Sequence, residues 1–199
     1  MSKVTCDMAA SLDGYVTGLN QTLERPFGDG VGERLHEWMF EEPEEHAEVL
    51  RAITAAGAFI MGRNMFSPSR GEHDLEWKGW WGEEPPYHAP VFVLTHHPRE
   101  SVTMKGGTTF HFVTDGIEAA MARAREAAGD DDVSIAGGAA TVNQYLAAGL
   151  IDELRLHVVP LILGRGERLF EGVGEIGLEQ VGAPSGTARV THLTYRIRR

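Results

Sequence analysis

The segment from Val133 to Gly166 holds the pattern with the clearest chemical meaning in this chain. A short β-prone run, Val133 to Ala136, ends at Gly137 and Gly138, and a helical stretch follows. A strand, paired glycines and a helix can turn free backbone N–H groups and the positive end of the helix dipole toward a phosphate. The segment therefore predicts a nucleotide pocket at this turn.

Four predicted strands end in short polar or glycine-rich segments. These segments are residues 11–14 (SLDG), 62–65 (GRNM), 95–97 (THH) and 137–140 (GGAA). In open α/β sheets ligands bind beyond the carboxyl ends of the strands, so the four segments are expected to converge on one cleft. Ordinary turn chemistry is the alternative explanation for any one of them taken alone.

Two charged residues in these segments are candidates for chemistry. Asp13 lies in a turn just beyond a buried strand, where partial desolvation would raise its pKa and suit it to proton transfer. The alternative is an aspartate that satisfies its own turn backbone. Arg63 begins the helix after Gly62, where a guanidinium opposes the helix dipole, so an anionic partner would explain it. A solvated surface arginine is the alternative.

Residues 67–90 contain Trp77, Trp80 and Trp81 without a clear period, which predicts a long ordered loop. Trp80 and Trp81 could form a lid that stacks on a planar heterocyclic substrate, or a contact between subunits. The alternative is a loop held to the body of the protein by its own aromatic rings. We favour the lid or the interface.

Several other sites are excluded by missing motifs. The GxGxxG fingerprint, the phosphate-binding GxxxxGK[ST] loop and the GxSxG nucleophile elbow are absent. The chain has 9 histidines but no HExxH or HxxxH pair, and its single cysteine, Cys6, cannot complete a thiolate site, so no metal is expected.

The bulk composition narrows the class of protein. With 199 residues and 42% hydrophobic content, a single domain spanning 1–199 is expected. A net charge of −11 argues against nucleic-acid binding, which needs a basic surface. The lone Cys6 favours a reducing compartment, and neither an apolar leader nor a membrane-length apolar run is present. We expect a cytoplasmic protein that does not bind membranes.

Strands alternate with helices through most of the sequence, and strands alone follow near the end. Apolar strands are predicted at residues 4–9, 58–61, 91–95, 109–113, 133–136, 154–158 and 189–198. Helices are predicted from Pro43, from a capping box at residues 115–118, and after Gly138. This order predicts an α/β fold with a mixed, mostly parallel sheet flanked by helices and antiparallel C-terminal edge strands.

Five segments resemble the dihydrofolate reductase-like superfamily, in particular the C-terminal reductase domain of the bacterial bifunctional riboflavin-biosynthesis deaminase/reductase. They occur in the order found in that group and cover nearly the whole chain. They are residues 11–16 (SLDGYV), 59–63 (FIMGR), 93–95 (VLT), 135–139 (IAGGA) and 150–154 (LIDEL) with 160–164 (PLILG).

The resemblance implies NADPH as hydride donor, a small-molecule substrate and a homodimer formed through the terminal strands. Asp13 would lie near the reacting centre, with Ser11 and Gly14 closing over nicotinamide and substrate. The implied cofactor-binding residues are Gly62, Arg63 and Asn64 near the adenosine 2′-phosphate, Thr95 at the adenine, and Gly137, Gly138, Ala139 and Thr141 around the pyrophosphate.

The sequence also departs from that group. Asn64, Met65, Phe66 and Ser67 replace the usual threonine and aromatic–acid pair, residues 77–86 are an insertion, and the deaminase half is missing. We therefore expect a stand-alone NADPH-dependent reductase of a small heterocyclic or carbonyl substrate, in its narrowest form 5-amino-6-(5-phosphoribosylamino)uracil. The alternatives are an NADP-binding module without turnover, acting as sensor or assembly partner, and a dihydrofolate or pterin reductase.

Overall fold

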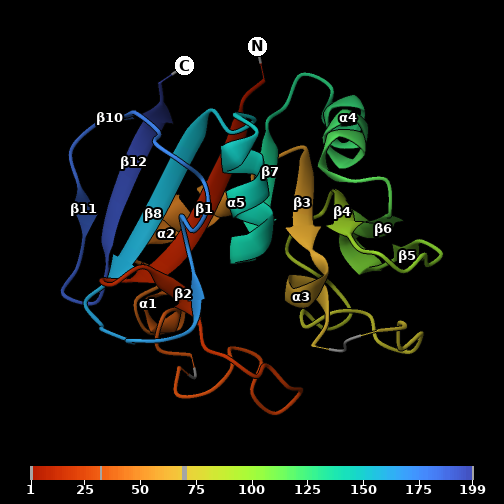
Figure 1. Cartoon of the computed structure of the whole chain (residues 1–199), viewed down its shortest axis with the longest axis horizontal. Helices are drawn as coiled ribbons and strands as arrows, with labels where there is room; N and C mark the ends of the chain where they lie inside the picture. Colours follow the sequence, from red (N-terminus) through yellow and green to blue (C-terminus); the bar gives the residue numbers. More distant parts are fainter. Residues whose placement is uncertain (1, 32, 69–70, 199) are drawn as a thin grey trace.

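A computed structural model describes residues 2–31, 33–68 and 71–198. Its central sheet has the order β10-β12-β8-β1-β7-β3-β4-β6-β5, with β11 paired to β12 (Figure 1). The strands are β1 (Val4–Ser11), β2 (Tyr15–Thr17), β3 (Ala58–Gly62), β4 (Pro90–Leu94), β5 (Val102–Thr103), β6 (Thr109–Val113), β7 (Val133–Gly137), β8 (Glu153–Val159), β9 (Glu167–Arg168), β10 (Leu178–Gln180), β11 (Ser185–Gly186) and β12 (Thr191–Ile197). The helices are α1 (Glu37–Glu41), α2 (Ala47–Ile53), α3 (Arg63–Phe66), α4 (Ile117–Ala128) and α5 (Ala139–Ala147), with a 3-10 turn η1 (Lys105–Gly107).

The middle of the sheet is parallel and its margins are antiparallel. β8, β1, β7, β3, β4 and β6 run in the same direction. β12 is antiparallel to β8, β10 to β12, and β5 to β6. Strands covered on both faces read as continuous apolar runs, as in β3, where every residue is buried. The predicted fold class is confirmed.

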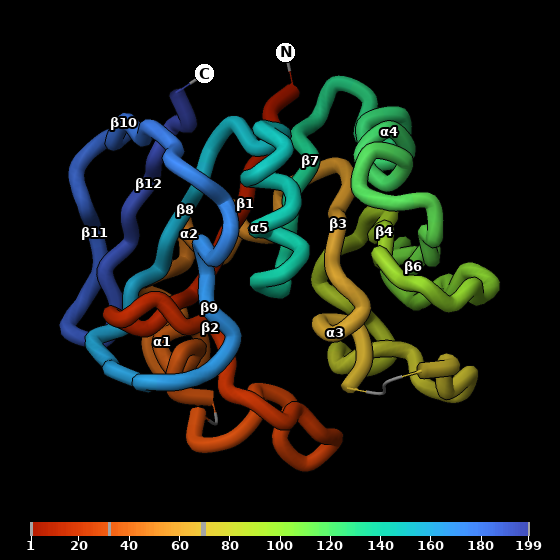
Figure 2. The backbone as a smooth tube through the Cα atoms, viewed as in Figure 1, coloured from red at the N-terminus to blue at the C-terminus, as the bar shows by residue number. Residues whose placement is uncertain are grey.

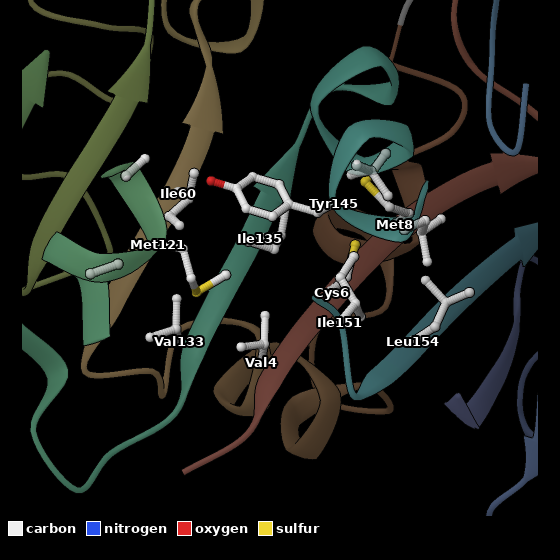
Figure 3. Close-up of a cluster of buried hydrophobic side chains, with 14 of the residues drawn as sticks. Val4, Cys6, Met8, Ile60, Met121, Val133, Ile135, Tyr145, Ile151 and Leu154 are labelled. Atoms are coloured by element: carbon white, nitrogen blue, oxygen red, sulfur yellow. The ribbon is translucent and has the colours of Figure 1, made fainter. Parts of the chain in front are cut away.

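One face of the sheet packs against α4 and α5. Alternate residues of β1, namely Val4, Cys6 and Met8, point to this face and join Met121 of α4 and Tyr145 of α5 in the main core (Figure 3). The Tyr145 hydroxyl donates to the carbonyl oxygen of Ile117 at 2.8 Å, which links the two helices. This packing holds the start of α5 directly behind the carboxyl end of β7.

The opposite face has two separate covers. α1 and α2 lie behind β8 and β1 in Figure 1, and Trp38 of α1 packs there with Val159 of β8. The loop between α3 and β4 covers β3, β4 and β6 through a second aromatic cluster that includes Trp81, Tyr87 and Phe110. The predicted loop 67–90 is therefore ordered and packed, apart from residues 69 and 70, which lie outside the described part of the chain.

Some local predictions differ from the structure. The capping box at residues 115–118 does not form, because Gly116 is the N-cap and makes no side-chain hydrogen bond. The helix predicted from Pro43 begins at Ala47. β2, β9 and the other very short strands carry no period that a sequence pattern could detect. Across the described residues, no helix has the length and apolarity to cross a membrane.

Candidate functional site

The polar segments at the strand ends lie next to one another. β1, β7, β3 and β4 are consecutive in the sheet, so Ser11, Gly137, Gly62 and Leu94 end neighbouring parallel strands at one edge. At a spacing of about 4.8 Å per strand, the four ends span roughly 14 Å. The sheet thus brings together the four segments that the sequence predicts to share a cleft.

The turn after β1 is tied to the loop that follows β8. The Asp13 carboxylate accepts hydrogen bonds from the Ser11 hydroxyl (2.7 Å) and from the backbone N–H groups of Leu163 (3.0 Å) and Gly164 (2.7 Å). Leu169 N–H in turn donates to the Gly14 carbonyl at 2.9 Å. Figure 2 shows the segment carrying β9 beside β2, and the two strands pair.

These contacts correct the expectation for the Asp13 pKa. The Ser11 hydroxyl, followed by the Leu163 and Gly164 N–H groups, lowers the pKa of Asp13 to about 2. The predicted rise through desolvation is wrong, because hydrogen bonds to the charged form outweigh it. Asp13 is an ionised carboxylate that fastens the turn.

The turn after β7 presents open space at the N-terminus of α5, where the first N–H groups of a helix have no partner within the helix. Gly137 has φ 128°, the Gly137–Gly138 peptide is cis, and Gly138 is the N-cap of α5 without a side-chain hydrogen bond. No described atom lies within 4 Å of a Cβ built on Gly138, whereas one on Gly137 would meet Met65 Sδ at 3.2 Å. A Cβ at Gly138 would therefore project into open space at the helix N-terminus.

Gly62 and Thr141 form a tight contact beneath this turn. A Cβ on Gly62 would collide with the Thr141 hydroxyl oxygen, and Thr141 is 6% exposed. Thr141 is therefore a buried packing residue between β3 and α5, placed behind Gly138 and Ala139. Its expected role at the pyrophosphate stays a prediction.

Arg63 and Thr95 lie on neighbouring strand ends and both contact the loop after α3. The Arg63 guanidinium donates to the carbonyl oxygens of Gly71 and of Glu72 (3.0 Å to the latter). The Thr95 hydroxyl lies 3.4 Å from His73 Nε2 and donates to the His97 carbonyl at 3.3 Å. Burial, with the nearby positive charges of Arg63 and Arg99, lowers the pKa of His73. Asn64 is exposed beside Arg63.

Trp80 and Trp81 are not brought to the Asp13 turn. Trp81 stacks on Phe110 of β6 at 5.8 Å, with its edge toward Tyr87, and Trp80 packs edge-on against Trp77 at 4.7 Å. β6 stands four places from β1 in the sheet order. Trp81 therefore helps to hold the loop to the body of the protein, as the alternative stated, and a lid or a subunit contact formed by this pair stays a prediction.

Two grooves share Glu167 of β9, and the first of them begins beside the glycine turn. One, of about 420 Å³, runs along α5 and is lined by Ala139, Ala140, Asn143, Gln144, Ala147, Glu167, Arg168, Glu171 and Gly172. The other, of about 500 Å³, is lined by Leu19, Asn20, Gln21, Thr22, Pro68 and Glu167. Glu167 lines both, so the grooves adjoin at β9.

Sequence reasoning did not single out Glu167 or the backbone donors of Leu163 and Gly164. The motif at residues 160–164 is a signal for the two backbone donors, because it ends at the N–H groups that hold Asp13. Glu167 carries no comparable signal, since only the β2–β9 pairing brings it to the cleft. Within the described residues, no cluster of three histidine, cysteine or acidic side chains could hold a metal ion.

The fold and the cleft at the strand ends define a dihydrofolate reductase-like α/β protein. Dihydrofolate reductase from Enterococcus faecalis, solved with NADP(H) and RAB-propyl, superposes with a TM-score of 0.58 at 15% identity, covering 99% of this chain and 97% of that one. The chain belongs to the family described as the RibD C-terminal domain, which matches residues 2–191.

Two further solved structures share the fold. A putative riboflavin biosynthesis protein from Shewanella sp. PV-4 has a TM-score of 0.68 at 23% identity, with 99% of both chains covered. The diaminohydroxyphosphoribosylaminopyrimidine deaminase/5-amino-6-(5-phosphoribosylamino)uracil reductase of Thermotoga maritima has a TM-score of 0.61 at 13% identity, covering 99% of this chain and 57% of that one.

Proposed function

We propose that this protein is an NADPH-dependent reductase of a small heterocyclic or carbonyl substrate. The observation that carries the proposal is the open N-terminus of α5 at Gly138, flanked by the ends of β1, β3 and β4. The family supports a reductase of the riboflavin-biosynthesis type. NADPH, when bound, supplies the hydride.

The residues at the strand ends fit a dinucleotide. Free N–H groups at the start of α5 and the space beside Gly138 suit a pyrophosphate, because a helix N-terminus favours negative charge. Arg63 and Asn64, at the end of β3, would meet the 2′-phosphate, and Thr95 would border the adenine. Gly62 and Thr141 would support the pyrophosphate turn from below through their mutual packing.

The turn at residues 11–14 would border the nicotinamide and the substrate. Ser11 and Gly14 shape this turn, while Asp13 stays ionised and fixes it to the loop at 163–164. A solvent water is then the source of the proton that the reduced substrate takes up. Asp13 acts as a positioning residue in this proposal, since the Ser11 hydroxyl and the Leu163 and Gly164 N–H groups hold its carboxylate in place.

The groove between residues 19–22, Pro68 and Glu167 is the proposed substrate space. Its lining combines amide, hydroxyl and carboxylate groups, which can bind the N–H groups of a pyrimidine or related heterocycle. The narrowest form of the proposal is 5-amino-6-(5-phosphoribosylamino)uracil as substrate. A cytoplasmic homodimer, built through the terminal strands, is part of the same proposal.

The experiment is a fluorescence titration with NADPH and NADH, followed by a turnover assay with pyrimidine, pterin and carbonyl compounds. In Gly138→Ala, the added methyl enters the pyrophosphate space without touching the fold, so NADPH binding should weaken by roughly tenfold or more. Gly177→Ala is the matched control, because its Cβ makes ordinary contacts with Arg198 and the backbone is not left-handed.

Each result bears on a different part of the proposal. Absence of micromolar binding of either nucleotide would overturn the oxidoreductase assignment. Binding without oxidation by any compound in the panel would favour the NADP-binding module, and turnover confined to pterins would favour the dihydrofolate or pterin reductase. Equal binding by the two glycine variants would remove Gly138 from the cofactor site.

A further inference from the structure

Three histidines on the sheet face opposite α4 and α5 form a buried, hydrogen-bonded row, called the histidine row below. The Nδ1 atoms of His157 (β8) and His192 (β12) are 2.8 Å apart, and Nε2 of His192 lies 2.9 Å from Nδ1 of His46, which precedes α2. Their exposed fractions are 3%, 8% and 2%. The Trp38 ring packs against all three, with centroid distances of 4.9–5.2 Å.

A carboxylate lies at each end of the histidine row. Glu42 Oε2 lies 3.4 Å from His46 Nε2, and Asp7 Oδ1 lies 3.5 Å from His157 Nε2. The Asp7 side chain is 6% exposed. Neither its oxygens nor His157 Nε2 has a hydrogen-bond partner among the described residues. The Asp7 end is therefore an unsatisfied polar contact inside the protein, which is costly.

Counting protons shows that one end must stay unsatisfied while all three rings are neutral. The histidine row makes four contacts, counted from Asp7 through the three rings to Glu42, and each contact needs one proton. Neutral imidazole carries a single N–H, so three neutral rings supply three. If the donors point toward Glu42, the His157 Nε2 lone pair faces Asp7. If they point toward Asp7, the His46 Nε2 lone pair faces Glu42.

Charged and titratable groups face the histidine row from every element packed against it. Thr187, followed by His46 and Arg189, lowers the pKa of Glu42, so that end stays ionised. Burial, with His157 and His46 nearby, lowers the pKa of the middle ring, His192, to about 4. The other facing groups are Glu153 and Arg155 on β8, His36 and Glu37 at the start of α1, and Arg189 before β12.

We propose that the histidine row takes up a fourth proton and is thereby a proton-linked latch that fastens residues 36–53 to the sheet. The latch consists of Asp7, His157, His192, His46 and Glu42. With the fourth proton, every contact from Asp7 to Glu42 has a donor and an acceptor. Without it, a lone pair opposes a carboxylate and the attachment is weaker. This inference is independent of the proposed cofactor and substrate.

Isosteric amides provide the test, because they supply an N–H permanently where the proton is missing. Native-state hydrogen exchange, corrected for the intrinsic pH dependence, would follow the amides of Met39, Glu42 and Leu50, which are bonded within this segment. Burial lowers the pKa of His36 and His192, which weakens protection in the wild type and in the variants alike as the pH falls. The latch is therefore measured as the ratio of wild-type protection to Asp7→Asn protection. This ratio should rise by roughly tenfold from pH 8 to pH 6, the size of one hydrogen bond gained.

Glu42→Gln is the second variant, since its amide can donate to His46 at the other end, and the ratio of wild-type protection to Glu42→Gln protection should rise in the same way as the pH falls. His96→Gln changes an exposed histidine that is not part of the histidine row, and it should behave as the wild type. The Trp38 indole N–H, which donates to the Leu35 carbonyl, gives an NMR reading of the same transition. Ratios of wild-type to variant protection that do not change with pH for either amide variant would overturn the proposal.

Discussion

At the scale of single residues, the candidate site shows how hydrogen bonding decides the state of a side chain. Asp13 has the position that the sequence predicts, at the turn beyond β1, but its pKa moves opposite to the prediction. The Ser11 hydroxyl is a local donor, but the backbone donors at 163 and 164 come from a segment 150 residues away. No local pattern around Asp13 reveals them.

Replacement of Asp13 with asparagine should loosen this turn without removing a titrating group. The amide places N–H groups where the carboxylate accepts, so the turn loses contacts, and kcat/KM should fall several-fold with a lower Tm. Between pH 5 and 9 the shape of the rate profile should not change, because a carboxyl with a pKa of about 2 does not titrate there. Loss of a limb in the pH profile would instead identify Asp13 as the proton donor.

Arg63 has two roles to distinguish, support of the loop at residues 71–72 and binding of a 2′-phosphate. If it binds the phosphate, Arg63→Ala should weaken NADPH by roughly tenfold or more while changing NADH little, because NADH lacks that group. Arg99 is the matched control, since it also donates to loop carbonyls, at Leu75 and Trp77. Equal losses for both nucleotides, reproduced by Arg99→Ala, would assign Arg63 to the loop alone.

At the scale of elements, the sequence predicts the long strands and helices well and the short ones poorly. β3 is a continuous apolar run and β7 is apolar except for Ser134, because both faces of a parallel sheet are covered, and such runs are visible without a structure. β2 and β9 are three and two residues long and exist through pairing with each other. Their pairing places Glu167 in the cleft, which no local preference indicates.

The loop carrying the tryptophans shows the same limit. Its composition is compatible with a lid, an interface or a packed cover, and the packed cover is visible only in the contacts of Trp81 with Phe110 and Tyr87. Trp81→Ala should lower the free energy of unfolding by roughly 2–3 kcal/mol, as expected for truncating a half-buried aromatic residue. NADPH affinity should change little. Chemical denaturation and the nucleotide titration measure the two effects, and a large loss of affinity with unchanged stability would return this residue to the site.

At the scale of the whole molecule, buried histidines couple the fold to pH. Burial, followed by the neighbouring His157, lowers the pKa of both His36 and His192 to about 4, from an ordinary value of 6.5. The unfolded chain therefore binds protons below pH 6.5 that the folded protein does not. Their contribution to stability is fully present above pH 6.5 and is lost as the pH falls toward 4.

Urea denaturation at a series of pH values should show this loss. The free energy of unfolding should decrease by a few kcal/mol between pH 6.5 and pH 4, at about 1.4 kcal/mol for each unit of pKa shift. His192→Gln should reduce the slope, because the unfolded chain then has one fewer proton to gain. A variant with the wild-type slope would place the acid sensitivity elsewhere.

The sequence by itself determined the fold class, the strands of the parallel core and the segments at their ends. These features follow from local polarity and from the glycines that end β3 and β7, so they are written in consecutive residues. The tertiary structure decided which strands are neighbours, which donors reach Asp13, what Trp81 covers and that His46, His157 and His192 meet. Those outcomes depend on contacts between residues far apart in the chain, because burial and hydrogen bonding act through space rather than along the sequence.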